Sequence, residues 1–206
     1  MRESLAQACM AKGSLSQAVE LLSEAFRLAP SKDLYCTLKR AAQAASVWGQ
    51  TQTFANNCIA AKEGASPRDA HVMRILKIDV SILEGNLQEA AVLAASLDPI
   101  NHFDLLEKLA KSLEANLPDE ALAIYKRIAP PQAASGKHGG YVNAARTAIT
   151  AQLLMARLGD PQPDSYVDGL AKEFARKYSF VKMLREAQSA AAEQAATSPV
   201  KKPLSR

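Results

Sequence analysis

The segment most able to bind a phosphate is glycine-rich: Ser135-Gly136-Lys137-His138-Gly139-Gly140. A Walker-type loop requires G-x-x-x-x-G-K-[ST] between a strand and a helix. Here the lysine precedes the glycine pair, no serine or threonine follows, and no strand pattern leads in. The segment is therefore typical of a flexible linker, and an anion held at the N-terminus of the next helix is the alternative.

The histidines and cysteines do not have the spacing of a metal site. The histidines are His71, His102 and His138, and the cysteines are Cys9, Cys36 and Cys58. No histidine pair is four residues apart, and no cysteine pair forms C-x-x-C. Each cysteine falls on the apolar side of an expected helix, which indicates a small core residue in a reducing compartment. We expect no metal, no cofactor and no enzymatic activity.

A basic run near the C-terminus is the one feature that suits nucleic-acid binding. It comprises Lys172, Arg176, Lys177, Lys182 and Arg185. Aromatic residues such as Phe174 and Tyr178 interleave with it, and residues 137–206 hold 11 Lys and Arg against 6 Asp and Glu. The same aromatics also fit a core stripe, with the charges forming a solvated face. Nucleic-acid association through this basic face is therefore the second hypothesis.

The elements that carry these residues are expected to be helices in a repeat. Gly13, Gly49 and Gly85 are separated by steps of 36 residues, and the same step links Ala18 to Phe54 and Ala90. Each copy then runs into a proline. A glycine turn, a small residue that permits close helix approach and a terminating proline define a helix-turn-helix unit.

The hairpins predict an all-α, right-handed α-solenoid of about 10–11 helices. Four TPR-like hairpins fill residues 1–130, and Pro130-Pro131 ends the last of these helices. A flexible linker follows over 131–140, longer C-terminal helices pack on the solenoid over 141–195, and a disordered tail covers 196–206. Ser66-Pro67 has the composition of a helix start, with a serine cap and proline at the first helical position.

The first unit resembles the tetratricopeptide repeat (TPR). Gly13, Ala18, Leu22, Ala25 and Pro30 occupy the spacings of that family's second helix, although its early tryptophan and Leu-Gly pair are missing. This resemblance implies stacked helical hairpins with a concave binding face.

A second resemblance covers nearly the whole chain. The order of Ala121-Leu122-x-x-Tyr125, Tyr141-x-x-Ala144 and Phe174-x-x-x-Tyr178-x-Phe180-x-x-x-Leu184 is similar to the C-terminal helical region of bacterial SWIM-type zinc-finger proteins and related uncharacterised helical domains. The C-x-C and C-x-H of the finger itself are absent from the sequence. The resemblance therefore implies an architecture, and the finger's metal and nucleic-acid roles do not carry over.

The leading functional hypothesis is a protein-interaction module, a scaffold or adaptor, that binds a protein or peptide in the concave groove. The candidate groove residues are Lys39, Gln43, Arg74, Lys77 and Asp79. Asp79 interrupts the apolar stretch 75–83, so it either faces outward or places a carboxylate on the concave wall.

Membrane and export signals are not expected. No apolar run approaches the roughly 18–20 residues needed to span a bilayer, and the first residues lack a hydrophobic signal region. We expect a cytoplasmic protein. Met1 falls close to the start of a first helix, so we also expect the chain to be cut from a longer protein at a repeat boundary.

Overall fold

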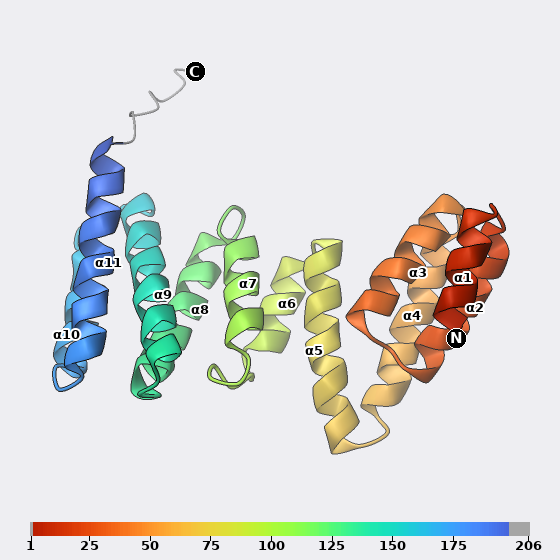
Figure 1. Cartoon of the computed structure of the whole chain (residues 1–206), viewed down its shortest axis with the longest axis horizontal. Helices are drawn as coiled ribbons and strands as arrows, with labels where there is room; N and C mark the ends of the chain where they lie inside the picture. The colour runs from red at the N-terminus through yellow and green to blue at the C-terminus, as the bar shows by residue number, and fades with distance from the viewer. Residues whose placement is uncertain (1, 198–206) are drawn as a thin grey trace. The chain divides into compact units, whose positions relative to one another are not determined.

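The computed structural model describes residues 2–197, and this part of the chain is all-helical (Figure 1). Its eleven helices confirm the predicted all-α class and the predicted number of helices. The chain divides into two compact units, Met1–Ala95 and Ser96–Arg206. This division falls well before residue 130, where the sequence predicted the end of the hairpin repeats.

Unit 1 contains three helical hairpins: α1 (Arg2–Ala11) with α2 (Leu15–Leu28), α3 (Lys32–Ala44) with α4 (Trp48–Glu63), and α5 (Pro67–Glu84) with α6 (Leu87–Ala94). Unit 2 contains α7 (Phe103–Leu113), α8 (Pro118–Ala134), α9 (His138–Arg157), α10 (Asp164–Glu173) and α11 (Tyr178–Thr197). As predicted, Pro67 begins α5 and Ser66 caps it, because the Ser66 Oγ accepts a 3.1 Å hydrogen bond from the Asp69 N–H.

The hairpin turns follow the glycine repeat in two of three cases. Gly13 and Gly85 have φ of 77° and 79°, a left-handed conformation that glycine adopts without a steric penalty. In the second hairpin this conformation belongs to Ser46, with φ of 60°, and Gly49 lies inside α4. The prediction from the repeat that Gly49 makes this turn is therefore wrong, because the turn comes three residues before the glycine.

The corrected register is visible in the second helix of each hairpin, which buries a residue pair four positions apart. The pairs are Ala18 and Leu22 in α2, Ala55 and Ile59 in α4, Ala90 and Ala94 in α6, and Ala121 and Tyr125 in α8, all 2% exposed or less. Ala55, and not Phe54, is thus the equivalent of Ala18. A small residue at the first position lets the helix approach its neighbour closely.

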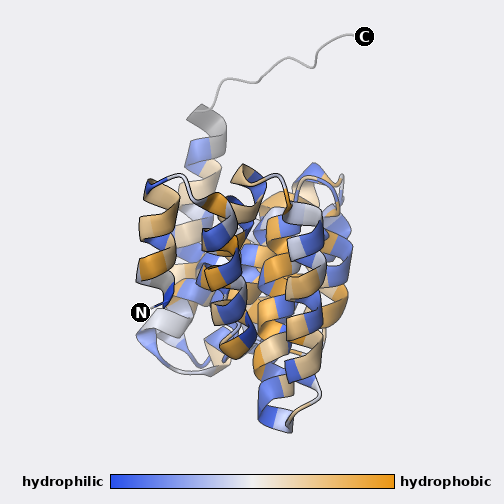
Figure 2. Cartoon of the chain, turned by 90° about the vertical axis from the view of Figure 1, so that its right-hand side faces the viewer, coloured by the Kyte–Doolittle hydropathy of each residue, from blue (hydrophilic) through white to orange (hydrophobic). Residues whose placement is uncertain are grey.

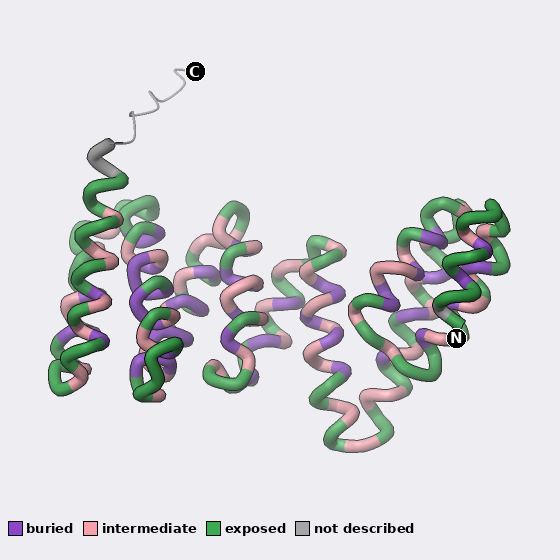
Figure 3. Tube along the Cα trace, in the orientation of Figure 1, coloured by how far each residue is buried: buried purple, intermediate pink, exposed green. Residues whose placement is uncertain are grey.

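Apolar residues at helical spacing build a separate core in each unit. The unit 1 core includes Leu22, Phe26, Tyr35 and Leu38, and the unit 2 core includes Phe180 and Leu184 among others. Figure 2 shows the mixture of apolar and polar positions along single helices, and Figure 3 shows buried positions recurring along them. This pattern is expected of helices that bury one stripe.

Helix α8 continues through Pro130 and Pro131, so the prediction that these prolines end it is wrong. Proline has no N–H, and Pro130 therefore leaves the carbonyl of Lys126 without its usual helical donor. The hydroxyl of Tyr166 on α10 donates to this carbonyl at 3.4 Å. A donor from 40 residues further along the chain thus compensates for part of the loss.

The predicted flexible linker over 131–140 is also corrected, because residues 131–134 belong to α8 and residues 138–140 to α9. Only residues 135–137 connect the two helices. Gly140 explains why the connection is so tight. A Cβ at this position would lie 2.3 Å from Ser135 Oγ and 2.7 Å from the carbonyl oxygen of Gln132, so the two helices meet where only glycine fits.

Two further predictions concern the ends of the chain and membranes. The predicted disordered tail over 196–206 lies mostly outside the described residues, although α11 includes Ala196 and Thr197. Within residues 2–197, none of the helices combines the length and apolar character needed to cross a bilayer.

Candidate functional site

The predicted groove residues lie on α3 and α5 of unit 1, and three of them form ion pairs within that unit. Lys39 Nζ is 2.8 Å from Glu84 Oε1, and Asp79 Oδ1 is 3.0 Å from Lys32 Nζ. Both pairs join α3 to α5. The Asp79 side chain is only 15% exposed, so the expectation that it faces outward is wrong.

The remaining groove candidates are dispersed. Lys77 pairs with Glu63 of α4, Gln43 is exposed near the end of α3, and Arg74 is half-buried in α5. The charges on α3 and α5 that do come together therefore connect neighbouring helices, a structural role. We do not retain these five residues as the site.

Glu84 is the centre of this internal network. Its side chain is 12% exposed and accepts hydrogen bonds from the Tyr35 hydroxyl at 3.1 Å, from Lys39 Nζ at 2.8 Å and from Gln52 Nε2 at 3.3 Å. Burial, followed by the charge of Glu84, raises the pKa of Tyr35 above its ordinary value. Lys39 Nζ also lies 5.6 Å from the ring centroid of Trp48.

The residues of the predicted basic face also fall into two groups, those that make contacts within unit 2 and those that are exposed. Lys177 Nζ donates to the carbonyls of Ala133 at 3.0 Å and Ala134 at 2.6 Å, so it caps the C-terminus of α8. Arg185 pairs with Asp168 at 2.8 Å. The other three residues, Lys172, Arg176 and Lys182, are exposed.

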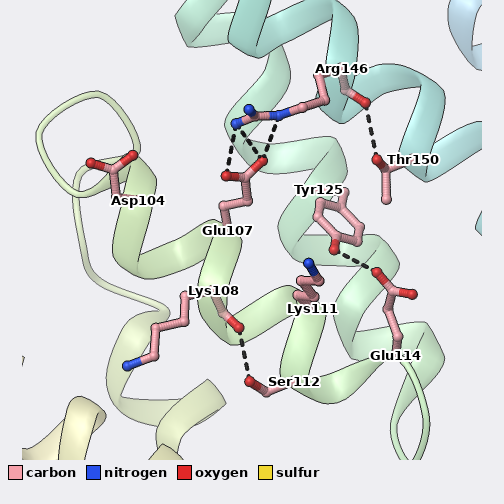
Figure 4. Close-up of a pocket in the computed structure, with 9 residues that line it drawn as sticks. All are labelled: Asp104, Glu107, Lys108, Lys111, Ser112, Glu114, Tyr125, Arg146 and Thr150. Atoms are coloured by element: carbon pink, nitrogen blue, oxygen red, sulfur yellow. Dashed lines mark hydrogen bonds and ion pairs between the residues drawn. The ribbon is translucent and has the colours of Figure 1, made fainter.

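A different group of residues lines a cavity that lies within unit 2. The α7–α9 cavity, of about 560 Å³, is lined by Asp104, Glu107, Lys108, Lys111, Ser112 and Glu114 of the α7 region, Tyr125 of α8, and Arg146 and Thr150 of α9 (Figure 4). The helices α7 and α9 form its two walls. Except for Tyr125, its lining side chains are exposed or half-exposed, so the cavity is polar and open to solvent.

Ion pairs hold the two walls together. Arg146 donates to both carboxylate oxygens of Glu107, from Nε at 3.1 Å and from Nη2 at 2.8 Å. Arg157 lies 3.4 Å from Glu114 further along the same two helices. Because both contacts advance in the same chain direction, α7 and α9 run parallel. The two-point contact of Arg146 fixes its guanidinium plane more firmly than a single bond would.

Tyr125 supplies the only strongly buried side chain of this lining. It is 2% exposed, and its hydroxyl donates a 2.7 Å hydrogen bond to Glu114 Oε1. Burial, together with this bond to the carboxylate, raises the pKa of Tyr125 above its ordinary value. The tyrosine is therefore a neutral donor that fixes Glu114 at the end of α7.

Two charged residues of the α7–α9 cavity differ from the rest. Within residues 2–197, Asp104 and Lys111 have no hydrogen bond or ion pair to another side chain. Both are exposed, and they have opposite charges. In Figure 4, Lys111 lies between Glu107 and Glu114, and Asp104 lies at the far end of the same helix. They are the charges best placed to contact a ligand.

A short sequence pattern marks Glu84 and Glu114, the two glutamates that accept a hydrogen bond from a buried tyrosine. The repeat of 36 residues does not reveal this pattern, because its two copies are separated by another distance. Leu83-Glu84-Gly85-Asn86-Leu87 and Leu113-Glu114-Ala115-Asn116-Leu117 share the pattern L-E-x-N-L, 30 residues apart. In both places the glutamate lies at the C-terminal end of a first helix, as the last residue of α5 or directly after α7, and accepts a hydrogen bond from a buried tyrosine. No comparable sequence signal distinguishes Asp104 and Lys111.

Comparisons with known proteins identify no relative. No family model, no curated protein and no solved structure matches the chain. Within the described residues, no three His, Cys, Asp or Glu side chains come together in a way that would hold a metal ion. The candidate site is therefore defined by the structure alone.

Proposed function

We propose that this chain is a non-enzymatic cytoplasmic protein-interaction domain, a scaffold or adaptor, that binds a charged segment of a partner protein in the α7–α9 cavity. The observation that carries the proposal is the pair of oppositely charged residues Asp104 and Lys111 on one wall of an open cavity, neither of which makes a hydrogen bond or ion pair with another side chain of the described residues. A partner segment with charges of both signs would complement them.

The binding role is favoured over catalysis by the lack of an orienting partner for these two residues. Neither Asp104 nor Lys111 makes a hydrogen bond to another described side chain that would fix it for proton transfer. The other carboxylates of the cavity already accept hydrogen bonds, Glu107 from Arg146 and Glu114 from Tyr125. The cavity thus offers fixed charges and hydrogen-bond donors, which suit recognition.

The architecture that we propose for this module is a right-handed solenoid of TPR-like hairpins, as the resemblances imply. The repeated buried pairs, such as Ala18 with Leu22 and Ala121 with Tyr125, support equivalent hairpins in both units. The nucleic-acid alternative has less support, because Lys177 and Arg185 of the basic run are already engaged by backbone and carboxylate oxygens.

The test is selection of binding peptides on the full-length chain from a display library of random peptides. Dissociation constants of the enriched peptides are then measured by fluorescence polarisation for wild type, Lys111→Glu and Asp104→Lys. Lys172→Glu, at an exposed lysine outside the cavity, is the matched control. We expect each cavity variant to weaken binding about tenfold or more and 0.5 M salt to weaken it further. Binding that is equal in all four proteins would refute the proposal.

A further inference from the structure

A second recess lies on the other side of α9 and has the opposite character. The α9–α11 groove, of about 440 Å³, runs between Val142, Ile149 and Leu153 of α9 and Met183, Ala187 and Ala191 of α11. Val142 and Leu153 are 44% and 48% exposed, large fractions for branched apolar side chains in one groove. Small alanines on α11 leave space above that helix for another molecule's side chains.

The α9–α11 groove is continuous with the α7–α9 cavity. Arg146 and Thr150 line both recesses. The charged α7–α9 cavity and the apolar α9–α11 groove are therefore separated only by one turn of α9. A ligand that contacts Lys111 can extend across Thr150 and place its next side chains on Leu153.

We infer that the partner segment bound in the α7–α9 cavity is amphipathic, and that its apolar side chains occupy the α9–α11 groove. This inference rests on the proposed function. The charged residues on one side and the apolar groove on the other define two halves of one ligand: an acidic group for Lys111, and two or more large apolar side chains for the groove. Val142 to Leu153 spans about 16 Å, which corresponds to eleven residues of helix or about five residues of extended chain.

The ion pairs of the groove's edges favour a mixed ligand over a purely apolar one. Arg146 pairs with Glu107 and Glu186 with Lys182, and the side chains of Arg146 and Glu186 are 54% and 65% exposed, so both charged edges are in contact with solvent. An apolar segment without polar residues would cover these charges without replacing their water contacts. An amphipathic segment covers the apolar floor and leaves its polar side toward these edges.

The experiment uses peptides selected on the full-length chain from a library of random 16-residue sequences. The protein variants are Lys111→Glu, Leu153→Asp and, as the matched control, Val92→Asp, which alters a 67% exposed apolar residue of unit 1. Binding is measured by fluorescence polarisation, and sedimentation velocity reports the oligomeric state at the same concentrations. We expect enriched peptides to combine acidic and large apolar residues, and both Lys111→Glu and Leu153→Asp to weaken binding about tenfold or more.

A complementary measurement changes the peptide and compares its binding to wild type and to Leu153→Asp. Replacing the apolar residues of a selected peptide by serine should weaken binding to wild type, and should weaken it much less in Leu153→Asp, because the same contact is already lost. This result would separate loss of a contact from misfolding of the variant.

The outcomes distinguish the two proposals. Binding weakened by Lys111→Glu but unchanged by Leu153→Asp would overturn the amphipathic ligand and leave the proposed function standing. Binding unchanged by Lys111→Glu, or no enrichment of any peptide, would overturn both. A wild-type dimer that Leu153→Asp converts to a monomer would assign the α9–α11 groove to a second copy of the chain, and would also overturn this inference.

Discussion

The hydroxyl of Tyr125 lies 2.7 Å from Oε1 of Glu114, the carboxylate that also pairs with Arg157. The same relationship exists in unit 1, where the hydroxyl of Tyr35 lies 3.1 Å from Oε1 of Glu84 and Lys39 is the cation. Each glutamate stands at the C-terminal end of a first helix, where the helix dipole disfavours negative charge. A buried tyrosine and a neighbouring cation together offset this cost.

Replacing Tyr125 by phenylalanine should lower the free energy of unfolding by about 1.5 kcal/mol, since the bond it removes is to a charged acceptor. Urea denaturation of Tyr125→Phe, Glu114→Ala and the double variant would measure the coupling. We expect an interaction energy above about 0.5 kcal/mol. Strict additivity of the two single effects would show that this bond does not contribute to stability.

Stability should also fall at high pH because of the buried tyrosines. Burial is the main cause that raises the pKa of Tyr35, Tyr125 and Tyr166 above the ordinary value of 10.0. A raised pKa in the folded state means that the stabilisation is complete below about pH 10 and is lost as the pH rises toward the folded value. Each such tyrosine then costs up to about 1.4 kcal/mol per pH unit.

The measurement for this pH effect is the denaturation midpoint of wild type between pH 8 and pH 11. Tyr166→Phe should show a shallower decline above pH 10 than wild type. Tyr178→Phe, which removes the hydroxyl of a side chain with 83% exposure, serves as the control. Equal slopes in Tyr166→Phe and wild type would contradict the assignment.

Local pattern was enough to predict the helices, because apolar spacing and caps such as Ser66 act within a few residues. The end of α8 could not be predicted in this way. The rule that proline ends a helix holds when the freed carbonyl finds no donor, and here Tyr166 provides one from a distant helix. Lys177 illustrates the same limit, since its sequence neighbours indicate a solvated cation although the fold turns it onto α8.

The candidate site was even less accessible to sequence reasoning. Asp104 and Lys111 are ordinary exposed charges in the sequence, and their importance depends on which neighbours find partners. Glu107 finds its partner because α9 brings Arg146 beside α7, and Glu114 finds two partners, Tyr125 on α8 and Arg157 on α9. Lys39 and Asp79 were predicted as groove residues, but each forms an ion pair with a residue of a neighbouring helix, Glu84 and Lys32 respectively.

Two neighbouring glycines of α9 should respond in opposite ways to alanine. Gly140→Ala places a Cβ within 2.7 Å of the carbonyl oxygen of Gln132, a backbone atom that cannot move aside easily, so we expect a loss of about 1–3 kcal/mol. At Gly139 a Cβ would have no atom within 4 Å, and alanine should stabilise by up to about 1 kcal/mol. Thermal denaturation of the two variants tests this, and equal midpoints would contradict the close approach of α8 and α9.

Lys177→Met should destabilise the C-terminal helices by about 2 kcal/mol, because it removes a charged donor from two carbonyls at the end of α8. Methionine keeps most of the aliphatic contact with Phe174, whose ring centroid is 5.8 Å from the ammonium. Hydrogen exchange should become faster in α11, and Lys172→Met, at an exposed position on α10, should leave it unchanged. Similar exchange in both variants would show that Lys177 is a surface lysine without a capping role.

Glu84→Gln should destabilise unit 1 by about 3 kcal/mol although the side chain keeps its shape. Hydrogen-bond donors approach both oxygens of Glu84, Tyr35 and Lys39 at Oε1 and Gln52 at Oε2. The amide nitrogen faces either the Lys39 ammonium or the Gln52 amide, and in both orientations the half-buried ammonium of Lys39 loses its counter-ion.

Trp48 provides the readout for this last change. It is the single tryptophan of the chain, and its ring packs edge-on against Tyr35 with centroids 5.6 Å apart. Its fluorescence during urea denaturation therefore reports on the surroundings of Glu84. We expect the fluorescence midpoint to fall in Glu84→Gln and to stay at the wild-type value in Glu20→Gln, which alters an exposed carboxylate of α2. A midpoint that is the same in all three proteins would mean that the network around Glu84 contributes no net stability, as is known for some buried ion pairs.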